Sequence, residues 1–241
     1  MVHFPFQRLQ SDLSALISRT PAGQKLPSEP DLAKKLGVSR ATLREAMRSF
    51  ETQGMIRRRQ GSGTYVIGKT QVLNSGLEVL ESVDSIAKRL GLEVTASDLE
   101  VQTEPVEAVM ADKLGLSPGD MVTRVSRVIH TENRPVAYLV DTLPVNNLDA
   151  NDLPTDFHSS VVDFLLDRGD PISYARSNIS AIGATSSVAK ALEIQRGDVL
   201  LHFDSVSYDE KGKPYGSSVS YFIPGYFRFH VMRKVPVIPG I

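Results

Sequence analysis

The segment SRATLREAM, residues 39–47, has the residue types and spacing that DNA recognition requires. Arginine and hydroxyl side chains at the start of a helix can reach phosphates and base edges in the major groove. Four residues carry such groups within the first turn and a half of the expected helix: Ser39, Arg40, Thr42 and Arg44. The segment therefore predicts a recognition helix.

Two capped helices are expected to hold this segment. Ser28 can cap a first helix that has Pro30 in its first turn, and Gly37 readily adopts the left-handed conformation that ends a helix. Ser39 caps the second helix, which ends at Gly54. The apolar residues of this second helix recur at helical spacing and predict a buried face: Leu43, Ala46, Met47 and Phe50.

A β-hairpin is expected after the second helix. Two short strands, Met55–Arg59 and Thr64–Ile67, flank a tip at Gly61-Ser62-Gly63, and residues 57–60 (RRRQ) decorate one arm. An earlier helix, Phe6–Arg19, has an apolar stripe that can brace the motif from behind. Together these elements predict a winged helix-turn-helix.

Charge is distributed unevenly along the chain. Residues 1–70 hold 12 Lys and Arg against 5 Asp and Glu, a balance of +7, whereas residues 71–241 hold 15 against 23, a balance of −8. Helix-turn-helix shapes also occur inside enzymes and protein-binding domains, but a basic head of this kind neutralises phosphates. The charge pattern therefore favours double-stranded DNA as the partner of the first domain.

The composition is that of a soluble globular protein of one large domain or two ordinary ones, with 41% hydrophobic and 23% charged residues among 241. The chain has no apolar run of about 18 residues and no secretory signal, so we expect no membrane span. It has no Cys, which excludes disulfides and fits a reducing cytoplasm. Its five His are scattered, and neither a metal nor another cofactor is expected.

Residues 6–67 resemble the winged helix of the GntR family of bacterial transcription regulators. The matching residues are Leu26-Pro27-Ser28-Glu29, Leu32-Ala33, Val38-Ser39-Arg40, Thr42-Leu43-Arg44-Glu45-Ala46, Gly54 and Gly61-Ser62-Gly63-Thr64. Pro30 stands where the family usually has an Arg that often contacts DNA, so we expect a different operator preference.

The resemblance implies that Arg40 and Arg44 contact DNA and that Gln60-Gly61 enters the minor groove. The whole implied DNA-binding set is Ser28, Glu29, Ser39, Arg40, Thr42, Arg44, Arg59, Gln60, Gly61 and Gly63.

The rest of the chain contains an internal repeat. Residues 111–120 (ADKLGLSPGD) and 189–198 (AKALEIQRGD) share Ala, Leu, an aliphatic residue and Gly-Asp at a shift of 78 residues. A strand, a turn, a Pro and a second strand follow each copy, with first strands such as Val122–Ile129 and Val199–Tyr208. The repeated unit therefore predicts a helix, a Gly-Asp turn and a hairpin.

The two hairpins, with strands near Thr95–Thr103 and Ile172–Ile182, can form one antiparallel sheet. The helices expected beside it are Val106–Leu114, Ser160–Arg168, Ser186–Leu192 and one from Ser82 to Leu90. The predicted fold class is α+β.

Residues Val83–Val235 resemble the effector-binding (UTRA) domain of the HutC-type branch of the GntR family, which has a chorismate-lyase-like fold. The resemblance rests on Arg127, Pro135, Leu143-Pro144, Ser160, Leu165, Gly169, Gly212, Pro214, Tyr221 and Phe229. The expected domains are a winged helix over residues 1–68, a linker over 69–82, and an effector-binding and dimerisation domain over 83–241.

In that branch the pocket often binds anionic small molecules, frequently sugar phosphates. The resemblance gives an effector-binding set of Arg127, Tyr138, Ser160 and Tyr221. Ile129 stands where a second Arg is common, and one Arg leaves a phosphate under-neutralised. A sugar phosphate is therefore disfavoured, and a sugar, a nucleoside or a carboxylate is an equal alternative.

Each member of this set also has a structural explanation. Arg127 could pair with an acid on the sheet surface, Ser160 could be only a helix cap, and Tyr138 and Tyr221 could belong to the core.

We expect a ligand-responsive transcription regulator that binds a pseudo-palindromic operator as a homodimer, because one recognition helix reads too few base pairs. The resemblance favours a repressor released by a small metabolite. A regulator that responds to a partner protein or to no ligand is the alternative. An enzyme with an appended DNA-binding domain is disfavoured, because no nucleophile–base pair or metal cluster is recognisable.

Overall fold

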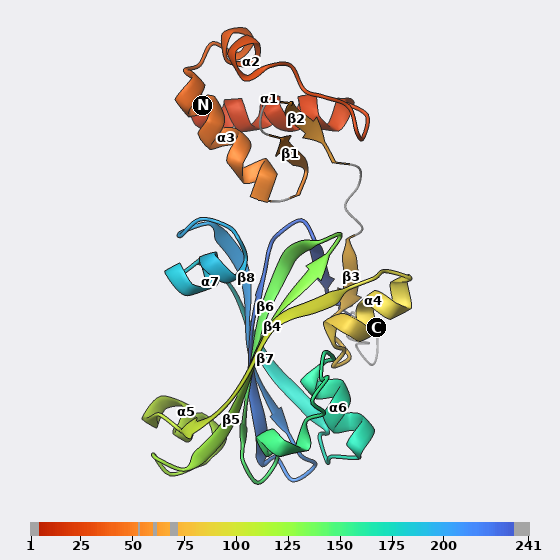
Figure 1. Cartoon of the computed structure of the whole chain (residues 1–241), viewed down its shortest axis with the longest axis vertical. Coiled ribbons are helices and arrows are strands. Elements are labelled where there is room, and N and C mark those ends of the chain that lie inside the picture. The colour runs from red at the N-terminus through yellow and green to blue at the C-terminus, as the bar shows by residue number, and fades with distance from the viewer. Residues whose placement is uncertain (1–4, 53, 60–61, 68–71, 234–241) are drawn as a thin grey trace, which may run out of the picture.

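A computed structural model describes residues 5–52, 54–59, 62–67 and 72–233. Figure 1 shows an N-terminal unit of helices and one hairpin, and a larger unit built on a sheet. No helix in the described ranges is long and apolar enough to cross a membrane.

The N-terminal unit is the expected winged helix-turn-helix. It consists of α1 (Pro5–Arg19), α2 (Glu29–Leu36), α3 (Arg40–Thr52), β1 (Ile56–Arg59) and β2 (Gly63–Val66). Its core comes from all three helices and the hairpin, and its least exposed side chains are Leu13, Leu32, Leu43, Ala46, Met47 and Ile56.

The helix caps are those that the sequence predicts. Ser28 accepts a hydrogen bond from the backbone N–H of Asp31, and Gly37 ends α2 with φ of 67°. The hydroxyl of Ser39 accepts from the N–H of Thr42 at 3.0 Å. These bonds fix the turn between α2 and α3, so the start of α3 has a defined direction.

The C-terminal unit contains one antiparallel sheet of six strands in the order β4-β5-β6-β9-β8-β7. The strands are β4 (Thr95–Pro105), β5 (Met121–Thr131), β6 (Arg134–Pro144), β7 (Tyr174–Gly183), β8 (Val199–Tyr208) and β9 (Pro214–Phe222). The predicted α+β fold is confirmed.

Helices lie on both faces of this sheet. Figure 1 shows α4 (Val83–Leu90) and α6 (Val161–Arg168) on one side, and α5 (Ala108–Leu114) and α7 (Ser186–Ala191) on the other. A short 3-10 helix, η1 (Ala150–Asp152), precedes α6. Ser82 and Ser160 cap α4 and α6, as the sequence predicts.

The internal repeat has the same hydrogen bonds in both copies. Asp120 accepts from the N–H of Ser117 at 2.9 Å, and Asp198 accepts from the N–H of Gln195 at 3.0 Å. The glycine before each Asp has a positive φ, 93° in the first copy and 88° in the second. The repeat is therefore structural as well as sequential.

One expectation about the linker differs from the structure. Residues 73–76, which lie inside the expected linker 69–82, form strand β3 (Leu73–Gly76). β3 pairs in parallel with β10 (Phe227–His230), and Leu73 is buried in the larger core. The partner strand is about 150 residues away in the chain, so local sequence patterns do not reveal this pairing.

A polar cluster ties the end of α6 to β9. Arg168 donates to both carboxylate oxygens of Asp170, at 2.7 and 3.0 Å, and the hydroxyl of Tyr215 also donates to Asp170. Burial works to raise the pKa of Asp170, but these hydrogen bonds hold it below its ordinary value. Burial and the bond to Asp170 raise the pKa of Tyr215 to about 12.

We predict that Asp170→Asn destabilises the protein at pH 7 by about 1–3 kcal/mol, because it removes the ionised acceptor that Arg168 and the hydroxyl of Tyr215 share. A lowered carboxyl pKa stabilises the folded state above the unfolded pKa of about 3.9, and this stabilisation is lost as the pH falls through the folded value. The difference between Asp170→Asn and the parent should therefore shrink at acid pH, as measured by urea unfolding. Asp167→Asn, on the exposed side of α6, is the control, and an equal loss there would contradict the assignment.

Candidate DNA interface and effector cavity

The start of α3 presents the predicted DNA-binding side chains to solvent. Ser39, Arg40, Thr42 and Arg44 are all exposed, whereas Leu43 between them is fully buried. The hydroxyls of Ser39 and Thr42 lie 2.8 Å apart and share a hydrogen bond. The helix therefore offers two guanidinium groups and two hydroxyls at one end.

Glu29 orients Arg44. The carboxylate of Glu29 accepts from Nε of Arg44 at 2.7 Å and lies 3.6 Å from Nε of Arg58. The Arg44 side chain stays 59% exposed while that of Glu29 is 17% exposed. The arrangement suits Glu29 to position an arginine and not to reach a nucleic acid itself. Ser28 is exposed and caps α2.

The side chain of Lys25 lies against Gly63 in the wing. Gly63 has φ of 115°, and a Cβ at this position would lie 2.2 Å from Cε of Lys25. Lys25 crosses the hairpin here, a contact that sequence reasoning missed because it joins separate segments. Gln60, Gly61 and the side chain of Arg59 lie outside the described residues.

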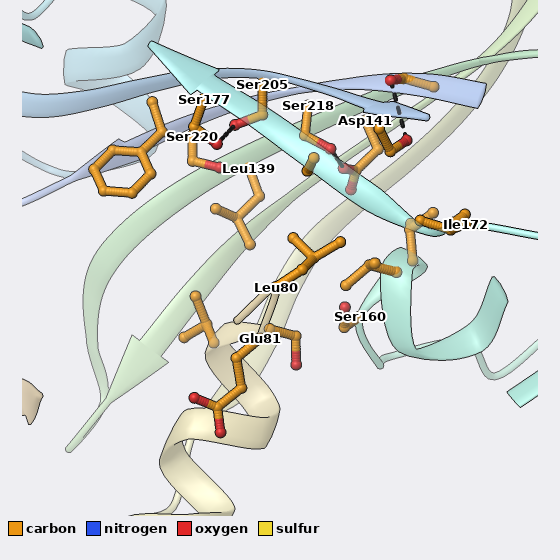
Figure 2. Close-up of a pocket in the computed structure, with 18 of the residues that line it drawn as sticks. Leu80, Glu81, Leu139, Asp141, Ser160, Ile172, Ser177, Ser205, Ser218 and Ser220 are labelled. Atoms are coloured by element: carbon orange, nitrogen blue, oxygen red, sulfur yellow. Dashed lines mark hydrogen bonds between the residues drawn. The ribbon is translucent and has the colours of Figure 1, made fainter. Parts of the chain in front are cut away.

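A cavity of about 440 Å³ lies between one face of the sheet and the segments that lead into α4 and α6. Figure 2 shows Leu80, Glu81 and Ser160 on one side of it and the strand residues Asp141, Ser205 and Ser218 on the other. Its size is within the range of about 300–1,000 Å³ that is typical of small-molecule sites.

Arg127 lines this cavity and is itself only 3% exposed. Its Nη1 donates to Oδ2 of Asp141 at 2.7 Å, and Ser218 donates to Oδ1 of the same carboxylate at 2.5 Å. Arg127 therefore faces the cavity and is also paired with an acid, but this pair is buried and does not lie on the sheet surface.

Asp84, in the first turn of α4, is the second carboxylate that interacts with Arg127. Burial raises the pKa of Asp84, the charge of Arg127 works in the opposite direction, and Asp163 raises it further. Oδ2 of Asp84 and Nε of Arg127 are both buried, and neither has a hydrogen-bond partner in the part of the chain that the structure describes. Two polar atoms are thus left unsatisfied near one guanidinium.

A row of polar residues crosses four adjacent strands on the cavity face. Asp141, Ser218, Ser205 and Ser177 are aligned in register on β6, β9, β8 and β7. The hydroxyls of Ser177 and Ser205 lie 2.7 Å apart (Figure 2). None of these four belongs to the sequence-predicted set, although Asp141, a lone acid in the apolar run VAYLVDTL, is a signal that could have been used.

Ser160 lies at the cavity as well as capping α6. It is 1% exposed, and its hydroxyl accepts from the N–H of Asp163 at 3.3 Å. Its proton is thus free to be donated elsewhere. The structure therefore brings together Arg127 and Ser160.

Tyr138 and Tyr221 do not line the cavity with Arg127 and Ser160. They pair with each other and with Val128 across β5, β6 and β9, whereas Arg127 pairs with Leu139, so the two tyrosines lie on the opposite face of the sheet. Their rings stack at 6.0 Å, and burial raises the pKa of Tyr221. A bulge in the β5–β6 hairpin shifts the pairing by one residue and so places Tyr138 opposite Val128, whereas Tyr221 shares its face through the β6–β9 pairing.

Comparison with known proteins agrees with both units. Residues 6–66 match the model of "Bacterial regulatory proteins, gntR family", and residues 89–228 match that of the UTRA domain. The chain is 31% identical over 220 residues to the HTH-type transcriptional regulator Rv0792c of Mycobacterium tuberculosis, covering 88% of this chain and 79% of that protein.

Two further proteins are similar over most of their length. The HTH-type transcriptional repressor NagR of Bacillus subtilis is 26% identical over 87% of this chain and 86% of its own. The crystal structure of PhnF from Mycobacterium smegmatis has a TM-score of 0.65 at 21% identity, covering 95% of this chain and 100% of that one, and so shares the fold. With both family models matched in this order, the chain belongs to the GntR family of bacterial transcription regulators and carries a UTRA domain as its second unit.

Proposed function

We propose that this protein is a transcriptional repressor that binds operator DNA through the start of α3 and the wing, and that a small metabolite in the cavity releases it. The relatives described above include a regulator and a repressor, and all match across both units. A regulator of chromosomal genes works in the cytoplasm.

The observation that carries the ligand response is the course of the chain between the two units. Residues 75–83, which follow the connection from the DNA-binding unit, form one wall of the cavity. They continue from β3, which is bonded to β10. A ligand that moves this wall therefore acts on the segment that leads to the DNA-binding unit, as coupling between the two sites requires.

Two contacts between the units support the same coupling. Nη2 of Arg48, on the recognition helix, donates to Oδ1 of Asp198 at 3.2 Å, in the turn of the second repeat. The hydroxyl of Tyr226 lies against Gly54, where a Cβ would approach it to 2.4 Å. A shift within the effector domain can thus change the position of α3.

Selection from a pool of random duplexes by the full-length protein tests the DNA-binding part. We expect enrichment of a two-fold-symmetric site whose binding weakens steeply as the salt concentration rises. A pool with no enriched sequence would exclude the proposed function.

On the selected site, we predict that Arg44→Ala weakens binding about 5–150-fold, corresponding to about 1–3 kcal/mol. The loss has two causes, because removal of Arg44 also leaves Glu29 without this partner close to the DNA. Gel shifts would measure the effect, with Arg176→Ala, an exposed arginine of β7, as the matched control. Equal binding by the Arg44 and Arg176 variants would remove α3 from the interface.

We also predict that the protein is a homodimer at micromolar concentration, since a symmetric operator needs two recognition helices. Sedimentation equilibrium should give twice the mass of the chain. A monomer that still selects a two-fold-symmetric site would contradict this.

A further inference from the structure

The only positive charge among the described residues that line the cavity is already paired. Arg127 is the sole basic residue there, and Glu78, Glu81 and Asp141 are acidic. The guanidinium of Arg127 lies 2.7 Å from Asp141 and also interacts with Asp84. The cavity therefore has no uncompensated cation to offer an anion.

This balance acts against a phosphorylated or carboxylated ligand. An anion that leaves water for a partly enclosed site needs compensating charge, and here it would meet three carboxylates and a shared arginine. Glu81 is itself bonded to Arg89 at 2.8 Å, which leaves that arginine engaged too.

Hydroxyl groups take the place of charge on the sheet side of the cavity. Ser177, Ser205 and Ser218 lie in one row, on strands spaced about 4.8 Å apart, with Ser220 beside the row and Ser160 opposite it (Figure 2). A serine hydroxyl can both donate and accept a hydrogen bond, as can each hydroxyl of a sugar or polyol, and Ser218, which donates to Asp141, can still accept.

Apolar side chains complete the cavity. Leu80, Leu139 and Phe203 lie at its wall and offer surface to the C–H groups of a ligand. Leu80 and Ser160 lie across the cavity from the serine row (Figure 2). A ligand that contacts both sides of the cavity therefore needs hydroxyl groups to meet the serines and C–H groups to meet Leu80.

We propose that the ligand of this cavity is an uncharged polyhydroxylated molecule, such as an unphosphorylated sugar or glycoside, and that its phosphorylated counterpart is rejected. The role of the cavity as the effector site rests on the proposed function, whereas the ligand class rests on the groups named here.

Thermal shift and titration calorimetry on the full-length protein test the ligand class. The probes are neutral monosaccharides, disaccharides, alditols and methyl glycosides, each monosaccharide being paired with its 6-phosphate. We expect at least one neutral probe to raise Tm and to bind at least tenfold more tightly than its phosphate. Tighter binding of any phosphate, or no binding by the whole neutral panel, would overturn the inference.

Two variants localise the binding. Ser205→Ala should weaken binding of the best neutral probe about fivefold to tenfold, which corresponds to the loss of one hydrogen bond. Ser180→Ala is the matched control, because Ser180 lies on the opposite face of the sheet and is bonded to Nδ1 of His202 at 3.2 Å. Equal effects of the two substitutions would move the ligand out of this cavity.

Asp141→Asn tests the charge argument separately. It should strengthen binding of inorganic phosphate at least tenfold over the parent, because it removes the carboxylate charge that lies 2.7 Å from the guanidinium of Arg127. Unchanged phosphate binding by a variant that retains the parent's circular dichroism would contradict the argument.

Operator release, measured with the same probes, separates the two conclusions. Release by a phosphate alone would retain the proposed function and reject the ligand class. A neutral sugar that binds without releasing the operator would retain the ligand class and reject the proposed function.

Discussion

The buried ion pair between Arg127 and Asp141 is the interaction around which the effector unit is organised. An arginine that is only 3% exposed is tolerated only with a close counter-charge, and removing one partner of such a pair typically costs about 3–5 kcal/mol. Asp141 meets this need while also accepting from Ser218. The same pairing removes the free positive charge from the cavity, so a requirement of folding determines which ligands the site can accept.

The orientation of the site depends on one extra residue in β6. Glu132 and Asn133 form a tight turn with positive φ at both positions, and Thr131 pairs with Arg134. Uninterrupted counting from this turn would pair Arg127 with Tyr138. In the structure Ile129 pairs with Ala137, which leaves Val136 as the bulged residue and pairs Arg127 with Leu139. A single inserted residue thus moves Tyr138 from the cavity face to the opposite face.

The features that could be predicted from the sequence are those that local signals determine. The winged helix and the repeat depend on local signals, such as Ser28 and Gly37 at helix ends, and both were predicted closely. The strands and helices of the second unit were likewise predicted as elements. The resemblance put Tyr138 and Tyr221 in the effector set, but they lie on the face opposite Arg127, since the register depends on a bulge that no motif marks. Ser205 and Ser218 went unnoticed for the same reason, since a serine in a strand carries no signal until its neighbours are known.

The boundary between the units is the remaining difference, and it bears on mechanism. A linker over residues 69–82 would belong to neither domain. Instead, β3 joins the effector unit through β10, and the residues after it form a cavity wall. Leu77, Val79 and Leu80 in this wall are substantially exposed, although large apolar side chains gain free energy from burial. Ligand contact with this segment would bury apolar surface on the very stretch of chain that leads to the DNA-binding unit. The free energy of binding is therefore available where the position of the recognition helix can respond to it.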